Sequence, residues 1–165
     1  MNNEQALNFL NAHQPLPPTN RMESALLLKF DEVRKFFLRY PDEQCVRLFL
    51  GAFGEGDGHG IYQLVEDVIS RYSEALIVKE LLFGLQSERS ATRHWCAQIA
   101  ASHPDASLRE PLLSMLSRDS VDERVAAVTA LEQLIDADVR AALRRRLDLE
   151  PNSNVRKLIK DVLSD

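Results

Sequence analysis

The feature that most constrains the fold is a pattern that recurs about every 31 residues over residues 74–165. Arg93 and Arg124 occupy the same position in two successive copies, and Arg156 occupies it in a third copy that is one residue longer. The leucines upstream keep the same register, with Leu81, Leu82 and Leu85 aligned on Leu112, Leu113 and Leu116. A pattern repeated at this length predicts a stack of similar structural units.

Each copy is expected to form two helices. The leucines at 112, 113 and 116 follow a helical period, and so do the small and aliphatic residues over 125–130. Asp119 and Ser120 in one copy, and Pro151 to Ser153 in the next, interrupt the pattern and supply helix caps. Neither segment alternates as a strand would, so the repeat predicts pairs of helices.

The N-terminal half is a looser version of the same plan. Residues 46–53 resemble the first helix of a pair, and residues 61–72 resemble the second. Upstream, residues 22–40 predict a strongly amphipathic helix and residues 2–12 a short one, joined by the proline-rich segment 14–20. Ten of the eleven aromatic residues lie in residues 1–83, as expected for a capping unit with larger core side chains.

These patterns predict a single domain over residues 1–165, a length that suits one domain. Residues 1–41 would form N-terminal capping helices, residues 42–73 a divergent repeat with a glycine loop, and residues 74–165 three regular units. The expected fold class is all-α: a right-handed α-α superhelix, or solenoid, of about ten antiparallel helices.

A short polar turn, an arginine and then a helix of small residues, repeated at this period, resembles HEAT repeats. The resemblance rests on Arg93, Arg124 and Arg156 with the alanine-rich stretches after them, and covers residues 74–165. The pattern is similar to the short repeats of bacterial HEAT-like and phycobilin-lyase-type proteins. It implies that the arginines are structural, each bonding turn carbonyls or acids and together forming a ladder along the stack.

Composition narrows the function classes. The net charge of −5 lowers the expectation of nucleic-acid binding and fits a basic protein partner better. Cys45 and Cys96 lie in helical patterns away from any metal-ligand spacing, which predicts buried, reduced thiols in a cytoplasmic protein. The sequence contains neither a recognisable signal peptide nor an apolar run of membrane-spanning length, and a monomer is expected.

The most unusual local feature is the run GEGDGHG at residues 54–60. Glycine at alternate positions permits positive φ and close backbone approach, and Glu55, Asp57 and His59 stand between the glycines. No lysine is present to cradle phosphate, and two acids are too few for a calcium loop. The run is therefore interpreted as an inter-helix turn or as a partner-contact loop, with a metal or catalytic trio as a further alternative.

No catalytic or metal site is predicted, and no cofactor, because the four histidines are scattered and no nucleophile motif is present. Trp95 is interpreted either as a core residue or as an anchor for a partner. The basic run at Arg144, Arg145 and Arg146 is interleaved with acids and predicts a solvated helix face, with an acidic partner or nucleic acid as alternatives.

The predicted function is therefore non-enzymatic protein binding, with Glu55, Asp57, His59 and Trp95 as candidate contacts. The resemblance and the charge together favour an immunity or inhibitor protein that neutralises a cognate bacterial toxin, such as a basic nuclease domain. Two alternatives stay open: a cofactor-handling protein similar to bilin lyases, and a nucleic-acid binder, because HEAT-like alkylpurine glycosylases grip DNA with such a scaffold.

Overall fold

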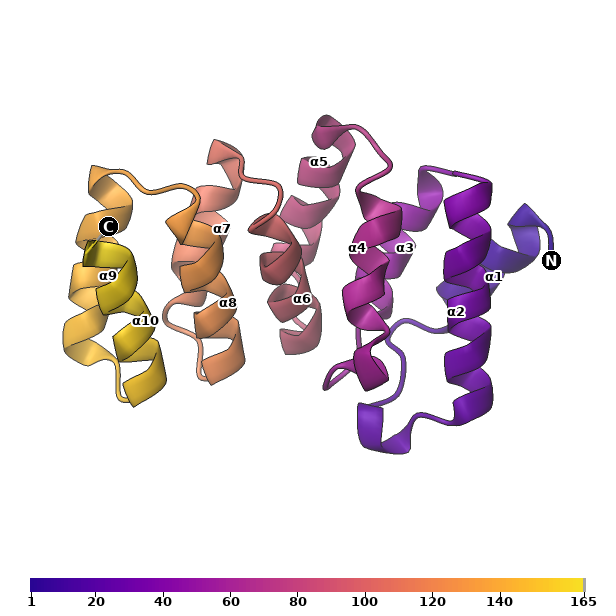
Figure 1. Cartoon of the computed structure of the whole chain (residues 1–165), viewed down its shortest axis with the longest axis horizontal. Helices are drawn as coiled ribbons and strands as arrows, with labels where there is room; N and C mark the ends of the chain where they lie inside the picture. Colours follow the sequence, from indigo (N-terminus) through magenta and orange to yellow (C-terminus); the bar gives the residue numbers. More distant parts are fainter. Residues whose placement is uncertain (165) are drawn as a thin grey trace. The chain divides into compact units, whose positions relative to one another are not determined.

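The regular repeats form three helix pairs in the C-terminal part of the chain. The computed structural model describes residues 1–164 and separates into two compact units, Met1–Glu80 and Leu81–Asp165, with the boundary inside helix α5 (Glu74–Leu85). The pairs are α5 with α6 (Ser90–Ala100), α7 (Arg109–Met115) with α8 (Val121–Glu132), and α9 (Ala137–Leu149) with α10 (Ser153–Ser164). In the second unit α6, α8 and α10 pack against one another in succession (Figure 1).

Small side chains let the helices of the second unit approach closely. Ala126, Ala127 and Ala130 on α8 are completely or almost completely buried, as are Ala97 and Ala100 on α6. Ser120 caps α8 by accepting a hydrogen bond from the Glu123 amide, and Asp136 caps α9 in the same way from Val139. The turns therefore both interrupt the helices and stabilise the next helix start.

The first unit contains α1 (Asn3–Ala12), α2 (Ser24–Arg39), α3 (Gln44–Ala52) and the short α4 (Val65–Ile69), and it begins α5. Its core is aromatic: Phe49 meets both Phe30 and Phe37 edge to face, with ring centroids 5.7 and 5.9 Å apart. All three rings are fully buried. The aromatic bias of the N-terminal half thus supplies the core of this unit.

Ten α-helices and no strands occur among residues 1–164, which confirms the predicted all-α class and the number of helices. One helix is shorter than expected. The segment 61–72 forms a 3₁₀ turn at Tyr62–Leu64 and then only the five residues of α4, because Arg71 and Tyr72 already make i→i−3 backbone bonds. None of the helices described over residues 1–164 has the length and apolar character needed to cross a membrane.

Both cysteines are buried, and their environment predicts low reactivity. Cys45 and Cys96 have no exposed surface and form no disulfide, and burial raises the pKa of both thiols, that of Cys45 to about 12. We expect the native protein to react with an aromatic disulfide reagent at least about 100-fold more slowly than the denatured chain, because only the thiolate attacks. Rapid labelling of either cysteine in native buffer would contradict this burial.

Candidate functional site

The glycine run at residues 54–60 forms a loop with an unusual backbone. Gly56, Gly58 and Gly60 have φ of 87°, 58° and 85°, and His59 has φ of 53°. His59 is the one non-glycine residue with positive φ among residues 1–164. Such a conformation is disfavoured for an L side chain, so the histidine is held there by the surrounding structure.

The proline-rich segment 14–20 frames this loop. Thr19 donates to the Glu55 carbonyl through both its amide, at 2.9 Å, and its hydroxyl, at 3.1 Å, and the hydroxyl accepts from the Gly58 amide at 2.8 Å. Gly54 donates its amide to the buried Tyr62 hydroxyl at 3.1 Å, and its Cα lies so close to the Leu16 carbonyl that a Cβ would collide with it. Hydrogen bonds and close packing thus fix the backbone of the loop at several points along its length.

The three reactive side chains of the loop are exposed. Asp57 caps the next turn by accepting from the His59 amide at 3.0 Å, and Glu55 and His59 also lie at the surface. No group of three His, Cys, Asp or Glu residues among residues 1–164 is arranged to hold a metal ion. The loop therefore presents two carboxylates and an imidazole at the surface.

Trp95, the fourth candidate contact, lies in the second unit on α6. Its side chain is only 9% exposed, and its ring stands edge to face with that of His94 at 5.2 Å. This position agrees with the alternative in which Trp95 is a core residue.

The repeated arginines bind the turns and the following repeat. Arg93 donates two hydrogen bonds to the Glu123 carboxylate, both 2.8 Å, and a third to the Ser87 carbonyl at 2.7 Å. Arg93 is 7% exposed and Glu123 only 1%. Burial disfavours the charged Glu123 carboxylate, but hydrogen bonds from Arg93 and Ser90 outweigh it and lower its pKa.

The next step of this ladder repeats the arrangement. Arg124 donates two 2.8 Å hydrogen bonds to Glu150 and two more to the carbonyls of Arg118 and Asp119. Arg156 in the last repeat donates to the carbonyls of Leu147 and Glu150. We call Arg93, Glu123, Arg124, Glu150 and Arg156 the arginine ladder; it joins successive turns of the second unit.

The sequence did not reveal the acidic members of the ladder. Glu123 lies in the first turn of α8 and Glu150 directly after α9, and both are buried ion-pair partners. The available signal was positional, since Glu123 and Glu150 lie 30 and 26 residues after the arginine that each one binds.

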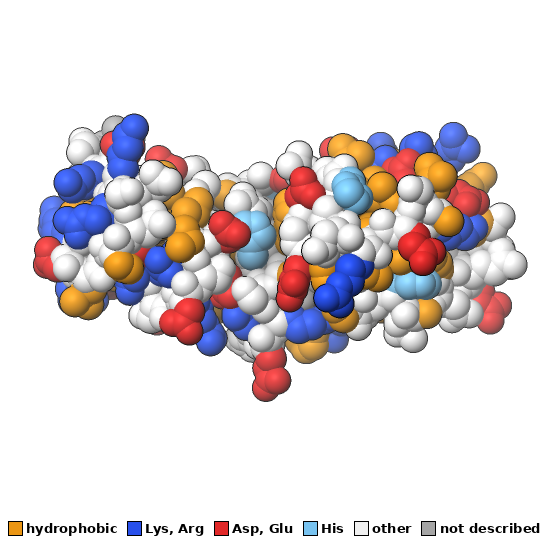
Figure 2. All heavy atoms as spheres, turned by 90° about the horizontal axis from the view of Figure 1, so that it is seen from below, with side chains coloured by type: hydrophobic (Ala, Val, Ile, Leu, Met, Phe, Trp, Pro, Cys, Tyr) orange, Lys and Arg blue, Asp and Glu red, His pale blue; other side chains and the backbone are white. Residues whose placement is uncertain are grey.

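The basic run divides between exposed and internally bonded residues. Arg144 and Arg145 are exposed, whereas Arg146 donates to Glu150, and Arg140 to the Leu163 carbonyl. Figure 2 shows Lys and Arg side chains over the α9–α10 end of the chain, with Asp or Glu among them. The cations are therefore not one continuous surface available to a polyanion.

Comparison with known proteins agrees with this architecture. The model of the family described as HEAT repeats matches residues 78–164, slightly more than half of the chain, and so covers the arginine ladder and the helices from within α5 to α10. No curated protein matches the chain. By its repeat pattern, its helix pairs and this match, the chain belongs to the HEAT-repeat family.

Proposed function

We propose that this HEAT-repeat protein is a non-enzymatic binding module, and that it acts as an immunity or inhibitor protein for a basic bacterial toxin domain. HEAT repeats form scaffolds that mediate protein interactions. The observation that carries the proposal is the tied-down glycine loop, which exposes Glu55, Asp57 and His59 on a fixed backbone. A contact loop that is ordered before binding loses little conformational entropy in the complex.

The distribution of charge supports a basic partner. Residues 1–80, which carry the loop, contain twelve acidic and eight basic residues, whereas residues 81–165 contain thirteen and twelve. Most of the acidic excess of the chain therefore belongs to the unit with the glycine loop. Acidic groups on an inhibitor accelerate encounter with a basic domain and occupy sites that bind phosphate in a nuclease.

The test uses the product of the gene that neighbours the gene for this chain. That product is expected to stop growth when expressed alone in a bacterial host and to be neutralised by co-expression of this chain. Binding is then measured calorimetrically with the wild type and with a Glu55→Gln, Asp57→Asn double variant. We expect the double variant to weaken binding at least about tenfold, or about 1.4 kcal/mol.

Asp67→Asn provides the matched control, because Asp67 is an exposed acid on α4 in the same unit but outside the loop. It should leave the affinity within about twofold of the wild type, since an isolated exposed charge contributes little. Unchanged toxicity on co-expression would overturn the immunity proposal. Equal affinity of the double variant and the control would remove the glycine loop from the interface.

A further inference from the structure

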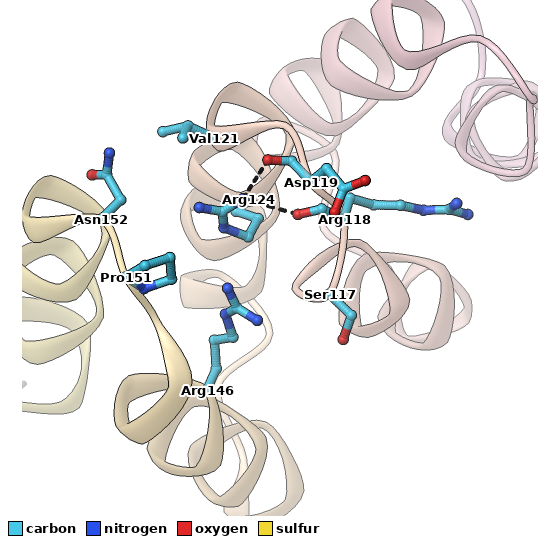
Figure 3. A pocket seen from close by; sticks show the side chains of 8 residues that line it. All are labelled: Ser117, Arg118, Asp119, Val121, Arg124, Arg146, Pro151 and Asn152. Carbon is cyan, nitrogen blue, oxygen red and sulfur yellow. Dashed lines mark hydrogen bonds between the residues drawn. The ribbon is translucent and has the colours of Figure 1, made fainter.

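A polar hollow in the second unit is not used by the proposed function. It has a volume of about 470 Å³ and lies over the α7–α8 turn, the start of α8 and the α9–α10 turn (Figure 3). Three arginines, Arg118, Arg124 and Arg146, contribute to its lining, together with one acid, Asp119. All of these residues belong to the same compact unit.

Two arginines of the hollow depend on one acidic residue. Arg124 and Arg146 share a single carboxylate, that of Glu150, whose Oε2 accepts from both Nε atoms at 2.8 and 2.9 Å. Burial disfavours the charged form of Glu150, but hydrogen bonds from Arg124, Asn152 and Arg146 lower its pKa to about 2, so it carries a full negative charge. Arg124 and Arg146 therefore place two positive charges against the one negative charge of Glu150, whereas the guanidinium group of Arg118 is directed away from them (Figure 3).

Arg146 has donor capacity left for a ligand. Its Nε and Nη2 donate to Glu150, at 2.9 and 2.7 Å, whereas its Nη1 donates to no other group among residues 1–164. The side chain is 18% exposed, and Figure 3 shows its guanidinium group directed toward that of Arg124 across the hollow. The remaining N–H groups of a guanidinium held in this way are preorganised for a second anion.

The surroundings favour a carboxylate on a short apolar stem. α8 and α10, each of twelve residues, both begin at the hollow, and helix starts favour negative charge. Val121, which is 37% exposed, and the exposed Pro151 line it as well, so they can pack against methylene groups. A glutamate side chain combines the charge and the apolar stem that this lining suits.

We propose that this hollow is a second binding site, independent of the glycine loop, that accepts an acidic side chain of a protein partner. The carboxylate of the partner pairs with the free Nη1 of Arg146 and is attracted by the positive charge of Arg124, while Glu150 keeps both guanidinium groups in place. The site therefore recognises an acidic peptide segment, whereas the glycine loop suits a basic surface.

The experiment follows the Nε–H signals of Arg124 and Arg146 by NMR in the full chain. Both protons are hydrogen-bonded to Glu150, which slows their exchange with water and makes them observable. The probe is a blocked peptide of four glutamates, compared with the same peptide of four glutamines. We expect saturable shifts at these signals and at the Asn152 amide with the glutamate peptide, and no shifts with the glutamine peptide.

Three variants make the assignment specific. Arg146→Gln removes the free donor and should weaken peptide binding at least fivefold. Arg144→Gln replaces an exposed arginine on the same helix and should leave the peptide affinity unchanged. Asn152→Asp adds a negative charge at the hollow but keeps an N-cap for α10, where Asn152 accepts from the amides of Asn154 and Val155. It should weaken binding at least fivefold even if Arg146→Gln destabilises the fold.

Three results of these experiments would contradict an acidic side-chain site at the hollow. Equal shifts with both peptides, or unchanged affinity of the glutamate peptide for Asn152→Asp, would overturn the proposal. Tighter binding of inorganic phosphate than of the glutamate peptide at the same signals would also overturn it, because the hollow would then be a phosphate site. None of these results bears on the toxin-binding proposal, which concerns the other unit.

Discussion

Replacement of Glu150 by alanine is expected to lower the free energy of unfolding by about 3–5 kcal/mol, the usual effect of removing one partner from a buried ion pair. Glu150 is 2% exposed and accepts hydrogen bonds from Arg124, from Arg146 and from the Asn152 amide. Its loss leaves the buried Arg124 guanidinium without a counter-charge and removes a bond that ties the α9–α10 turn. Urea unfolding followed by circular dichroism measures the change.

Asp148→Ala is the matched control for this prediction. Asp148 is an exposed acid near the end of α9, two residues before Glu150, so its removal should change the free energy of unfolding by no more than about 0.5 kcal/mol. Similar losses for the two variants would mean that the Arg124–Glu150 pair adds nothing beyond helix-end charge, and the arginine ladder would not be a stabilising element.

The same carboxylate gives the unfolding a defined pH dependence. The pKa of Glu150 falls from an ordinary 4.5 to about 2 in the folded protein. A lowered pKa means that the stabilisation is fully present above pH 4.5 and is lost as the pH falls toward 2, because the unfolded chain takes up the proton first. Glu150→Gln cannot be protonated in this range, so its stability should fall less steeply between pH 4.5 and 2 than that of the wild type.

The ladder also shows how far the sequence predicts the structure. The positions of Arg93, Arg124 and Arg156 follow from the period, because a repeated unit places equivalent residues in equivalent surroundings. The identity of their partners does not follow from it. An acid in the first turn of a helix is usually solvated, and only the packing of the next repeat buries Glu123 against Arg93.

The glycine run was predictable as a loop with positive φ, since glycine at alternate positions has few other uses. Its frame was not. Thr19 lies 36 residues from Glu55 along the chain, and nothing in the local sequence of either segment identifies the other as its hydrogen-bond partner. α4 is also shorter than the expected helix, because the backbone of Arg71 and Tyr72 makes i→i−3 bonds while the Tyr72 hydroxyl bonds to Asp42 and Cys45.

The centre of that loop is where a single added methyl group should have the next largest effect. Gly58 has φ of 58°, and a Cβ there would lie 2.7–2.9 Å from the ring of Tyr62. That ring is buried, with 1% exposure, and its hydroxyl holds the Gly54 amide. A side chain at position 58 therefore meets both an unfavourable backbone conformation and a ring that cannot move without releasing Gly54.

Gly58→Ala is accordingly expected to lower the free energy of unfolding by about 2–4 kcal/mol, from backbone strain together with overpacking. Gly60→Ala is the matched control, because Gly60 also has positive φ, 85°, but a Cβ there would have no atom within 4 Å. It should lower the free energy of unfolding by only about 1–2 kcal/mol, the strain alone. Urea titrations of the two variants measure the difference. Equal losses for Gly58→Ala and Gly60→Ala would show that the ring moves freely, and the loop would then lack the fixed backbone on which its role as a contact surface depends.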